Sequence, residues 1–215
     1  MSDARDVVTL HTNPMSRGRI VRWMLEELAC PYEAVIHAYG QTRTPDYLAI
    51  NPMGKVPAIE HRGRVVTETA AICTYLADAF PAAGLAPALD DPLRADYLRW
   101  LFFAAGPIEA ATTARALQME PPAEKTGFVG YGSYEAVMAV LEQAVSQASP
   151  WLLGERFTTA DVYLGSQVMF GLHFKSIEPR PAFVAYAKAL AKRPAYQRAS
   201  AADDALTPAN TAAGT

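Results

Sequence analysis

The stretch NPMGKVPAIEHRGRVVTETAAICTYLAD, residues 51–78, decides the expected fold of the first part of this chain. Two β-prone runs, residues 57–61 and 64–67, flank the pair Arg62-Gly63, and this pattern is typical of a β-hairpin. Residues 68–79 then carry apolar side chains at helical spacing. The stretch therefore predicts a strand, a tight turn, a second strand and a helix.

Upstream of this stretch the chain alternates between strand and helix patterns. The periodicity predicts a strand at 7–11, a helix at 17–29, a second strand at 32–37 and a short helix at 44–50. A β-α-β order requires a parallel pair of strands joined by a right-handed crossover, and the hairpin then adds antiparallel neighbours. Residues 1–80 are therefore expected to form a small α/β domain.

Downstream of residue 80 the composition changes. The segment FPAAGLAPALDDP is rich in Pro, Ala and Gly and predicts a linker over residues 81–91. An all-α helical-bundle domain is expected at 92–205, and the small polar residues 206–215 are expected to form a flexible tail. The predicted helices of this domain cover approximately residues 92–119, 131–148, 158–173, 179–192 and 194–203.

Length and charge exclude several classes of function. The chain has 215 residues, a formal net charge of −3 and no run of basic residues, which disfavours nucleic acid or an anionic membrane as partner. It contains no apolar stretch of membrane-spanning length and no secretory signal pattern at its start. A soluble, cytoplasmic protein is therefore expected.

The cysteines and histidines indicate neither a disulfide framework nor a metal centre. Cys30 and Cys73 both fall in helical patterns, which fits a reducing cytosol. The four histidines lie in separate predicted elements without metal-ligand spacing. No metal cofactor is therefore expected.

Pro57 stands at the mouth of the first hairpin strand. Proline cannot donate to a sheet ladder, so it suits the first residue of a strand or an edge, and X-Pro bonds are where a cis peptide costs little. A cis Val56-Pro57 bond would turn the N–H and C=O of Val56 outward, where an extended peptide can pair with them. An ordinary trans proline on an edge strand explains the dipeptide equally well.

Glu68 and Thr69 stand where the last hairpin strand enters a helix. A helix N-terminus offers free N–H groups and partial positive charge, which suits a carboxylate ligand. Alternatively, Thr67 caps this helix and Glu68 complements its dipole. Taken together, the strand edge and the helix start suit a small peptide with a free α-carboxylate.

These residues also carry a family resemblance. The run NPMGKVP, followed by ETAAI and TYL, resembles the second half of the thioredoxin-like domain of cytosolic glutathione transferases. TNPMSRGRIVRWMLEEL resembles their first strand-helix corner and PWLLGERFTTADVYLG their helical-domain signature, so the resemblance covers almost the whole chain. It implies an α/β thioredoxin-like N-terminal domain plus an all-α C-terminal helical-bundle domain, with a site similar to that of bacterial serine-type, theta-like or nu-like members.

The resemblance implies glutathione as co-substrate and assigns its binding to five residues. It implies that Pro57 is cis and that Val56 pairs with the cysteinyl backbone of the tripeptide. It further implies that Glu68 and Thr69 hold the γ-glutamyl end and that Lys55 lies near the anionic groups. For Lys55 the alternative is a solvated loop lysine.

The group that activates the glutathione thiol is expected just after the first strand. The thiolate is the nucleophile, and a free thiol with a pKa of about 8.5 is mostly protonated at neutral pH. The resembling families place Ser, Tyr or Cys here, and residues 11–19 contain no Tyr or Cys, which argues against thiol transfer through a protein cysteine. Ser16 is the first catalytic candidate, because its hydroxyl can donate to a thiolate beside a helix N-terminus. Asn13 and Thr12 are second choices.

Two alternatives remain open at this corner. In the first, Ser16 merely caps the first helix. In the second, backbone N–H groups stabilise the sulfur directly in place of the Ser16 hydroxyl. Arg17 and Arg19 either help to hold the anionic ligand or are exposed arginines at a helix start.

The helical domain contributes a pocket candidate and a folding motif. The Gly106-Pro107 step is expected to bend or interrupt the first long helix. Since that helix walls an apolar pocket in the family, Phe103 and Pro107 are candidates for the electrophile pocket. In FTTAD, Thr158 is expected to cap a helix with Asp161 three residues later, which assigns Asp161 to folding.

The resemblance thus implies a detoxifying glutathione transferase that transfers glutathione to alkyl or aryl groups of small hydrophobic electrophiles. Glutathione-dependent isomerases, dehalogenases and peroxidases need the same activated sulfur. A non-catalytic binding or scaffold protein of this fold is the alternative class. The resemblance also implies a homodimer.

Overall fold

The computed structural model describes residues 6–207 of the chain. The described residues form two compact units with separate cores: the first runs up to Ala83 and resumes at Lys192, and the second comprises Gly84–Ala191. Within the described part of the chain, no helix is long and apolar enough to cross a lipid bilayer.

A four-stranded sheet forms the centre of the first unit. Its strands are β1 (Val8–Thr12), β2 (Tyr32–Ile36), β3 (Ala58–His61) and β4 (Arg64–Thr67), in the spatial order β2-β1-β3-β4. β1 pairs with β2 in parallel, while the β1–β3 and β3–β4 pairs are antiparallel. The predicted β-α-β unit and its hairpin extension are confirmed.

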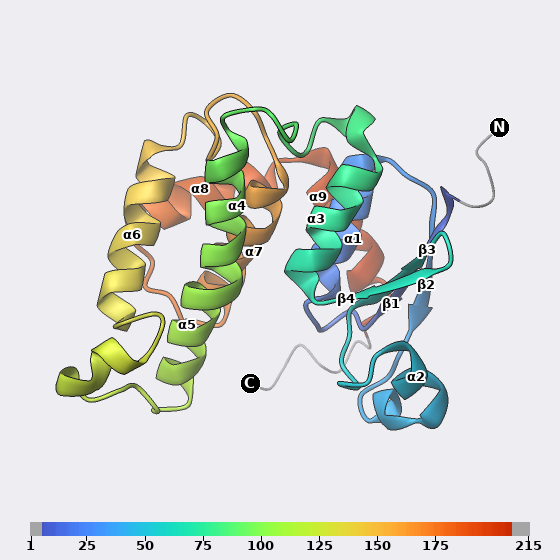
Figure 1. The fold of residues 1–215 in the computed structure, drawn as a ribbon, viewed down its shortest axis with the longest axis horizontal. Helices are drawn as coiled ribbons and strands as arrows, with labels where there is room; N and C mark the ends of the chain where they lie inside the picture. Colours follow the sequence, from blue (N-terminus) through green and yellow to red (C-terminus); the bar gives the residue numbers. More distant parts are fainter. Residues whose placement is uncertain (1–5, 208–215) are drawn as a thin grey trace. The chain divides into compact units, whose positions relative to one another are not determined.

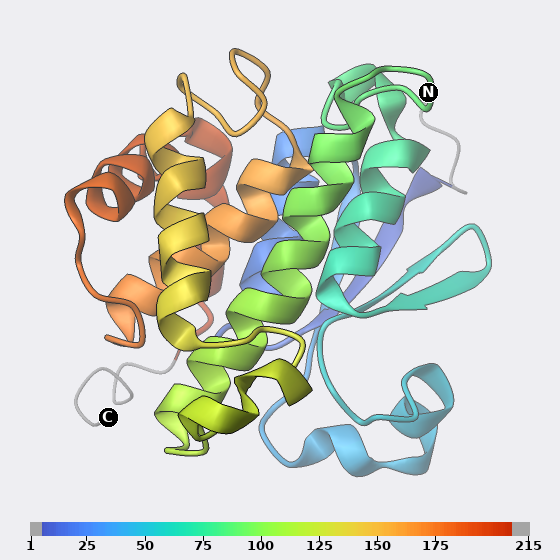
Figure 2. The same cartoon turned by 60° about the vertical axis from the view of Figure 1, so that its left-hand side comes forward.

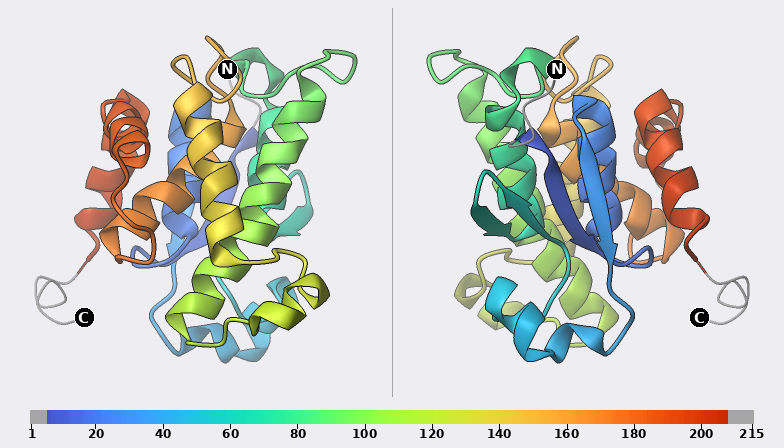
Figure 3. Two further views of the ribbon diagram at one scale, coloured as in Figure 1. Left: turned by 90° about the vertical axis from the view of Figure 1, so that its left-hand side faces the viewer. Right: turned by 90° about the vertical axis from the view of Figure 1, so that its right-hand side faces the viewer.

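Helices α1 (Gly18–Leu28) and α3 (Thr69–Ala79) lie on the same face of this sheet (Figures 1 and 3). The short helix α2 (Pro45–Ile50) follows the 3₁₀ turn η2 (Gln41–Arg43), and its first turn contains the proline that the sequence placed there. The apolar spacing of α1 puts one face of that helix into the core, where burial of large side chains stabilises the layer. The buried side chains include Leu10, Ile20, Trp23, Met24, Ile59, Ile72 and Leu76.

The last helix packs in the first unit, which corrects the expected helical domain at 92–205. Helix α9 (Pro194–Asp204) lies along α1, and the Tyr196 ring meets the edge of Trp23 with centroids 5.0 Å apart. The sequence predicts a helix at 194–203. The place where this helix packs, however, depends on partner residues that precede it by 166 to 185 positions in the chain. Four arginine–carboxylate pairs join this last segment to α1: Arg19–Asp204, Arg22–Asp203, Arg193–Glu27 and Arg198–Glu26.

The expected tail is described in part. Leu206 and Thr207 follow α9, and the backbone N–H of Leu206 donates to the carbonyl of Asp203. Residues 208–215 of that expected tail lie outside the described residues.

The second unit is helical throughout its regular structure. Helix α7 is its central element: its first ten residues, 159–168, are all buried, and it contacts both α4 and α8 (Figure 2). The 3₁₀ turn η3 (Pro81–Ala83) precedes this unit. Its elements are α4 (Arg94–Phe103), η4 (Ala104–Ile108), α5 (Glu109–Ala116), η5 (Ala123–Phe128), α6 (Tyr134–Gln147), α7 (Thr159–His173) and α8 (Pro181–Ala191).

The predicted helix at 92–119 is interrupted at the Gly106-Pro107 step. Residues Ala104–Ile108 form a π-helical turn, η4, between α4 and α5. Proline lacks the N–H that an α-helical bond requires and its ring clashes with the preceding turn, so a wider turn accommodates it. The expected interruption is confirmed.

The start of α7 confirms the predicted capping motif. The Thr158 side chain accepts from the backbone N–H of Asp161, while the Asp161 carboxylate accepts from the backbone N–H of Thr158 at 2.9 Å. Asp161 is fully buried and also accepts from the Leu152 N–H and the Tyr186 hydroxyl, both at 2.8 Å. These bonds tie three segments of the second unit together, so Asp161 serves folding.

Candidate functional site

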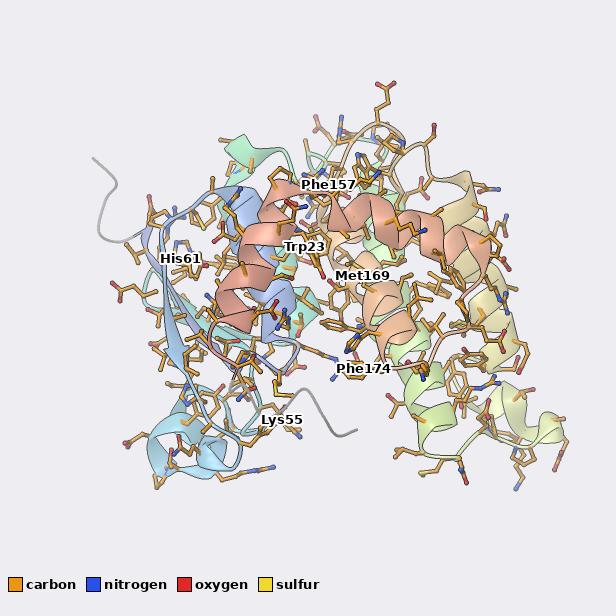
Figure 4. The ribbon with its side chains drawn as sticks, turned by 180° about the vertical axis from the view of Figure 1, so that it is seen from behind. Trp23, Lys55, His61, Phe157, Met169 and Phe174 are labelled. Atoms are coloured by element: carbon orange, nitrogen blue, oxygen red, sulfur yellow. The ribbon has the colours of Figure 1, made fainter. Side chains whose placement is uncertain are left out.

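Strand register brings the three predicted site segments to one end of the sheet. His11 of β1 lies opposite Ala58 of β3, and Ala58 lies opposite Thr67 of β4. Because both pairs are antiparallel, the loop leaving β1, the Val56-Pro57 step entering β3 and the Glu68-Thr69 step leaving β4 are neighbours. In Figure 4, Lys55 marks this end of β3 and His61 marks the other end.

The loop after β1 is held by its own side chains. Asn13 is 8% exposed; its Nδ2 donates to the His37 carbonyl at 2.8 Å, and its Oδ1 accepts the Met15 N–H at 2.9 Å. The hydroxyl of Tyr39 donates to the Met15 carbonyl at 2.8 Å. Asn13 therefore shapes this loop and ties it to the segment after β2.

Ser16 lies half-buried just before α1. Its hydroxyl donates to the Asn13 carbonyl at 2.7 Å, and its Oγ accepts the Gly18 N–H at 3.0 Å. Ser16 thus accepts the first N–H of α1, although the N-cap position itself is occupied by Arg17, which makes no side-chain capping bond. A side chain at Gly18 would collide with the Thr12 hydroxyl and crowd the Ser16 Oγ, so this close approach requires glycine. Rotation about the Cβ–Oγ bond of Ser16 would turn the hydroxyl proton from the Asn13 carbonyl to a ligand, while the Gly18 N–H continues to donate to the Ser16 Oγ.

The Val56-Pro57 peptide bond is cis, as expected from the resemblance. Within residues 6–207, neither the N–H nor the C=O of Val56 has a hydrogen-bond partner. The preceding carbonyl, that of Lys55, accepts from the Tyr47 hydroxyl at 2.7 Å and from the Asn51 Nδ2 at 2.8 Å. The hydrogen bonds to the Lys55 carbonyl therefore hold the Val56-Pro57 step in place, and Val56 offers one N–H and one C=O to a ligand strand.

The turn before this step also depends on glycine and asparagine. The Asn51 side chain accepts the Met53 N–H at 3.0 Å, and Gly54 has a φ of 59°. A side chain at Gly54 would press against the Thr42 carbonyl. This turn leaves the Lys55 side chain exposed at the end of the sheet (Figure 4).

Glu68 has a strained backbone at the start of α3. Its φ is 66° and its ψ is 116°, a region that residues with a Cβ rarely adopt, and its exposed side chain makes no capping bond. The N–H groups of Thr69, Ala70 and Ala71 have no acceptor among the described residues. Thr67 ends β4, so the alternative in which it caps the helix is wrong.

Several supporting residues were missed at the sequence level. Tyr47 and Asn51 hold the Lys55 carbonyl, and His37 receives the Asn13 amide. Burial raises the pKa of Tyr47 to about 12, which keeps its hydroxyl a donor. The Asn-Pro-x-Gly pattern at 51–54 is a turn signal that points to Asn51, whereas nothing local marks Tyr47.

The cysteines and the predicted pocket residues belong to other elements of the chain. Burial raises the pKa of Cys30 to about 11 and that of Cys73 to about 12, so both remain protonated at neutral pH. Phe103 ends α4 with its ring 5.9 Å from Trp100, and Pro107 lies in η4. Both pocket candidates are half-buried residues of the second unit.

Known proteins are similar to this chain in sequence and in fold. Residues 10–84 match the family model described as the glutathione S-transferase N-terminal domain. Glutathione S-transferase GstA of Escherichia coli O157:H7 is 30% identical over 160 residues, 74% of this chain and 78% of that protein. Maleylacetoacetate isomerase of Pseudomonas aeruginosa is 30% identical over 178 residues, 79% of this chain and 82% of that protein.

A solved structure agrees with these relatives. The crystal structure of a glutathione transferase homologue from Sulfitobacter, with bound glutathione, has a TM-score of 0.71 and 26% identity and covers 94% of this chain and 100% of that chain. The family-model match spans all three segments that meet at the end of the sheet, and the relatives extend it into the helices that follow. This chain belongs to the glutathione S-transferase family.

Proposed function

We propose that this protein binds glutathione at the end of the sheet, activates its thiol at Ser16 and transfers it to alkyl or aryl groups of small hydrophobic electrophiles. One observation carries the proposal: strand register gathers a hydroxyl, an unpaired strand edge and an uncapped helix start at one place. An extended tripeptide with charged ends has the chemistry that such a place recognises.

Binding is assigned to the five residues to which the family resemblance pointed. The N–H and C=O of Val56, displayed beside Pro57, pair with the cysteinyl backbone of glutathione. Glu68 and the start of α3 at Thr69 hold the γ-glutamyl end, whose carboxylate meets the free N–H groups. The exposed Lys55 ammonium attracts the remaining anionic group.

Thiol activation is assigned to Ser16, which makes this a serine-type enzyme. The Gly18 N–H polarises the Ser16 hydroxyl, and the positive end of the α1 dipole favours an anion nearby. Asn13 contributes by holding the loop. Phe103 and Pro107 are assigned to the electrophile pocket, since π-turns such as η4 occur frequently at functional sites. A cytoplasmic homodimer completes the proposal.

Ser16→Ala tests this assignment. Loss of the hydroxyl is expected to lower kcat/KM roughly 10- to 100-fold toward an aryl halide, with glutathione affinity nearly unchanged. Ser133→Ala is a matched control: Ser133 caps α6 by accepting the Ala136 N–H, so its loss should cost about 1 kcal/mol of stability and no activity. Equal rates in wild type and Ser16→Ala would refute the catalytic role.

An isomerase is the second candidate function. The relative named maleylacetoacetate isomerase is as similar to this chain as the named transferase. Isomerisation by addition and release of glutathione needs the same thiolate, so the site is unchanged. Turnover of a cis-enone acid without consumption of glutathione would favour this reaction, while net loss of free thiol favours transfer.

The hypothesis that this protein is a non-catalytic scaffold predicts a different outcome. It would be retained on immobilised glutathione but would turn over neither aryl halides, alkyl halides, peroxides nor cis-enone acids. That result would leave the binding assignment standing and remove the catalytic one.

A further inference from the structure

The loop that carries Ser16 is tied to the far end of the chain through Arg19. The Pro14 carbonyl accepts from the Arg19 Nη1 at 3.1 Å, and the Ser16 carbonyl accepts from the Arg19 backbone N–H at 3.2 Å. Arg19 therefore contacts two of the four residues from Asn13 to Ser16, one through its side chain and one through its main chain.

The same guanidinium binds the C-terminal helix. The Arg19 Nη2 donates to the Asp204 Oδ1 of α9 at 2.7 Å, across 185 positions of sequence. The planar guanidinium sets the directions of its two donors together, so anchoring one nitrogen on Asp204 aims the other at the Pro14 carbonyl. The Arg19 side chain is 25% exposed and the Asp204 side chain 67% exposed. A pair this exposed contributes little to stability, so its main effect is geometric.

A buried neighbour fixes where Asp204 stands. Arg22 donates to the Asp203 Oδ1 at 2.9 Å, with side chains 5% and 0% exposed. This pair sets the register of α9 on α1, and Asp204 is the next residue along that helix. A second exposed pair, Arg198–Glu26, joins the same helices, but Glu26 lies in the last turn of α1, away from the loop.

We infer that Asp204 and Arg19 are positioning residues, which hold the Pro14–Ser16 loop in the geometry that stabilises the glutathione thiolate. The inference rests on the proposed function, because it concerns how Ser16 meets the sulfur. It assigns the C-terminal helix a part in thiol activation, although none of its residues touches the ligand.

Asp204→Asn separates positioning from simple electrostatics. Removal of a negative charge near the site would by itself lower the pKa of the bound thiol, because an anion nearby disfavours the thiolate. Loss of positioning raises that pKa, because the hydroxyl and the helix start no longer aim at the sulfur. The two explanations therefore predict opposite signs.

The experiment measures the ultraviolet thiolate absorbance of bound glutathione against pH, together with kcat and the KM for glutathione. We expect Asp204→Asn and Arg19→Gln to raise the pKa of the bound thiol by about 0.5 to 1 and to lower kcat about 3- to 10-fold at neutral pH, with KM changed less than about twofold. Asp204→Glu, which keeps the carboxylate, is expected to restore most of kcat.

Arg198→Gln is the matched control, because it removes an exposed pair between the same two helices without touching the loop. It is expected to match Asp204→Asn in urea midpoint and wild type in thiol pKa. A lowered or unchanged thiol pKa in Asp204→Asn, or an Arg198→Gln variant with the same rise, would overturn the inference alone. Absence of a thiolate band in the wild-type complex would overturn both it and the proposed activation.

Discussion

Two helix starts in this protein solve the same problem in opposite ways. At the start of α7, a capping box and the Leu85 carbonyl, which accepts the Thr159 N–H at 2.9 Å, meet orphan N–H groups, and the Asp161 carboxylate inside the box is fully buried. At the start of α3, Glu68 is exposed, makes no capping bond and has a φ of 66°. The N–H groups at one start have acceptors within the protein, and those at the other start are left without one among the described residues.

The difference separates a folding motif from a binding site. A closed start contributes stability, because each buried donor has an acceptor. An open start at a strained residue gives up stability, and such features persist where a ligand supplies the missing partners. The acidic residues Asp161 and Glu68 accordingly have unlike roles, and two measurements test this.

Asp161→Ala should produce the largest effect. It leaves the N–H groups of Leu152 and Thr158 and the hydroxyl of Tyr186 without their acceptor in a buried place. We expect a loss of about 3 kcal/mol or more in the free energy of unfolding, measured by urea denaturation. Glu68→Ala is the comparison and should change that free energy by less than about 1 kcal/mol. Equal losses in the two variants would break the distinction between the two starts.

Glu68→Gln and Glu68→Gly should weaken the binding of glutathione. Loss of the carboxylate is expected to weaken glutathione binding roughly tenfold in both variants, measured by titration calorimetry. Glycine also removes the Cβ that makes the backbone conformation costly, so Glu68→Gly is expected to be more stable than Glu68→Gln by about 1 kcal/mol. Tighter glutathione binding in either variant would show that this open start serves another purpose.

A lower pH should give the smallest effect on stability, through two histidines of the unit that contains α3. Burial lowers the pKa of His37, with the neighbouring His11 adding to the effect, and burial and Arg62 lower that of His61, which Asp6 partly opposes. A histidine whose folded pKa is lowered binds protons preferentially in the unfolded state. Stability is therefore complete above the ordinary pKa of 6.5 and falls as pH drops below it.

Urea midpoints measured between about pH 7.5 and pH 5.5 should therefore decline on acidification. His61 Nδ1 lies 2.9 Å from the hydroxyl of Tyr75 in α3, and its Nε2 is buried without a hydrogen-bond partner among the described residues. His61→Gln is expected to flatten part of the decline. A midpoint that rises in acid would contradict the sign of both pKa changes.

Much of the site could be predicted because its signals are local. Pro57 marks a strand start, Glu68 and Thr69 mark a strand-to-helix step, and Thr158 with Asp161 spells a capping box within four residues. Each depends on the conformations and hydrogen bonds of adjacent residues. The outcome differed where a signal was ambiguous: Thr67 suggested a cap but ends β4, while Glu68 takes the cap position without a capping bond.

The family resemblance pointed to Ser16 and Lys55. The sequence by itself determined the order of strands and helices, the break at Gly106-Pro107, the strand start at Pro57 and the strand-to-helix step at Glu68-Thr69. These follow from periodicity, turn residues and proline chemistry, which act over a few positions of chain. Tertiary structure alone decided that α9 packs on α1, that Tyr47 holds the Lys55 carbonyl and that Asp204 reaches the Ser16 loop through Arg19. Such contacts form between side chains that are far apart in the sequence and are brought together by the packing of the layers. No local sequence pattern predicts which of these side chains will be in contact.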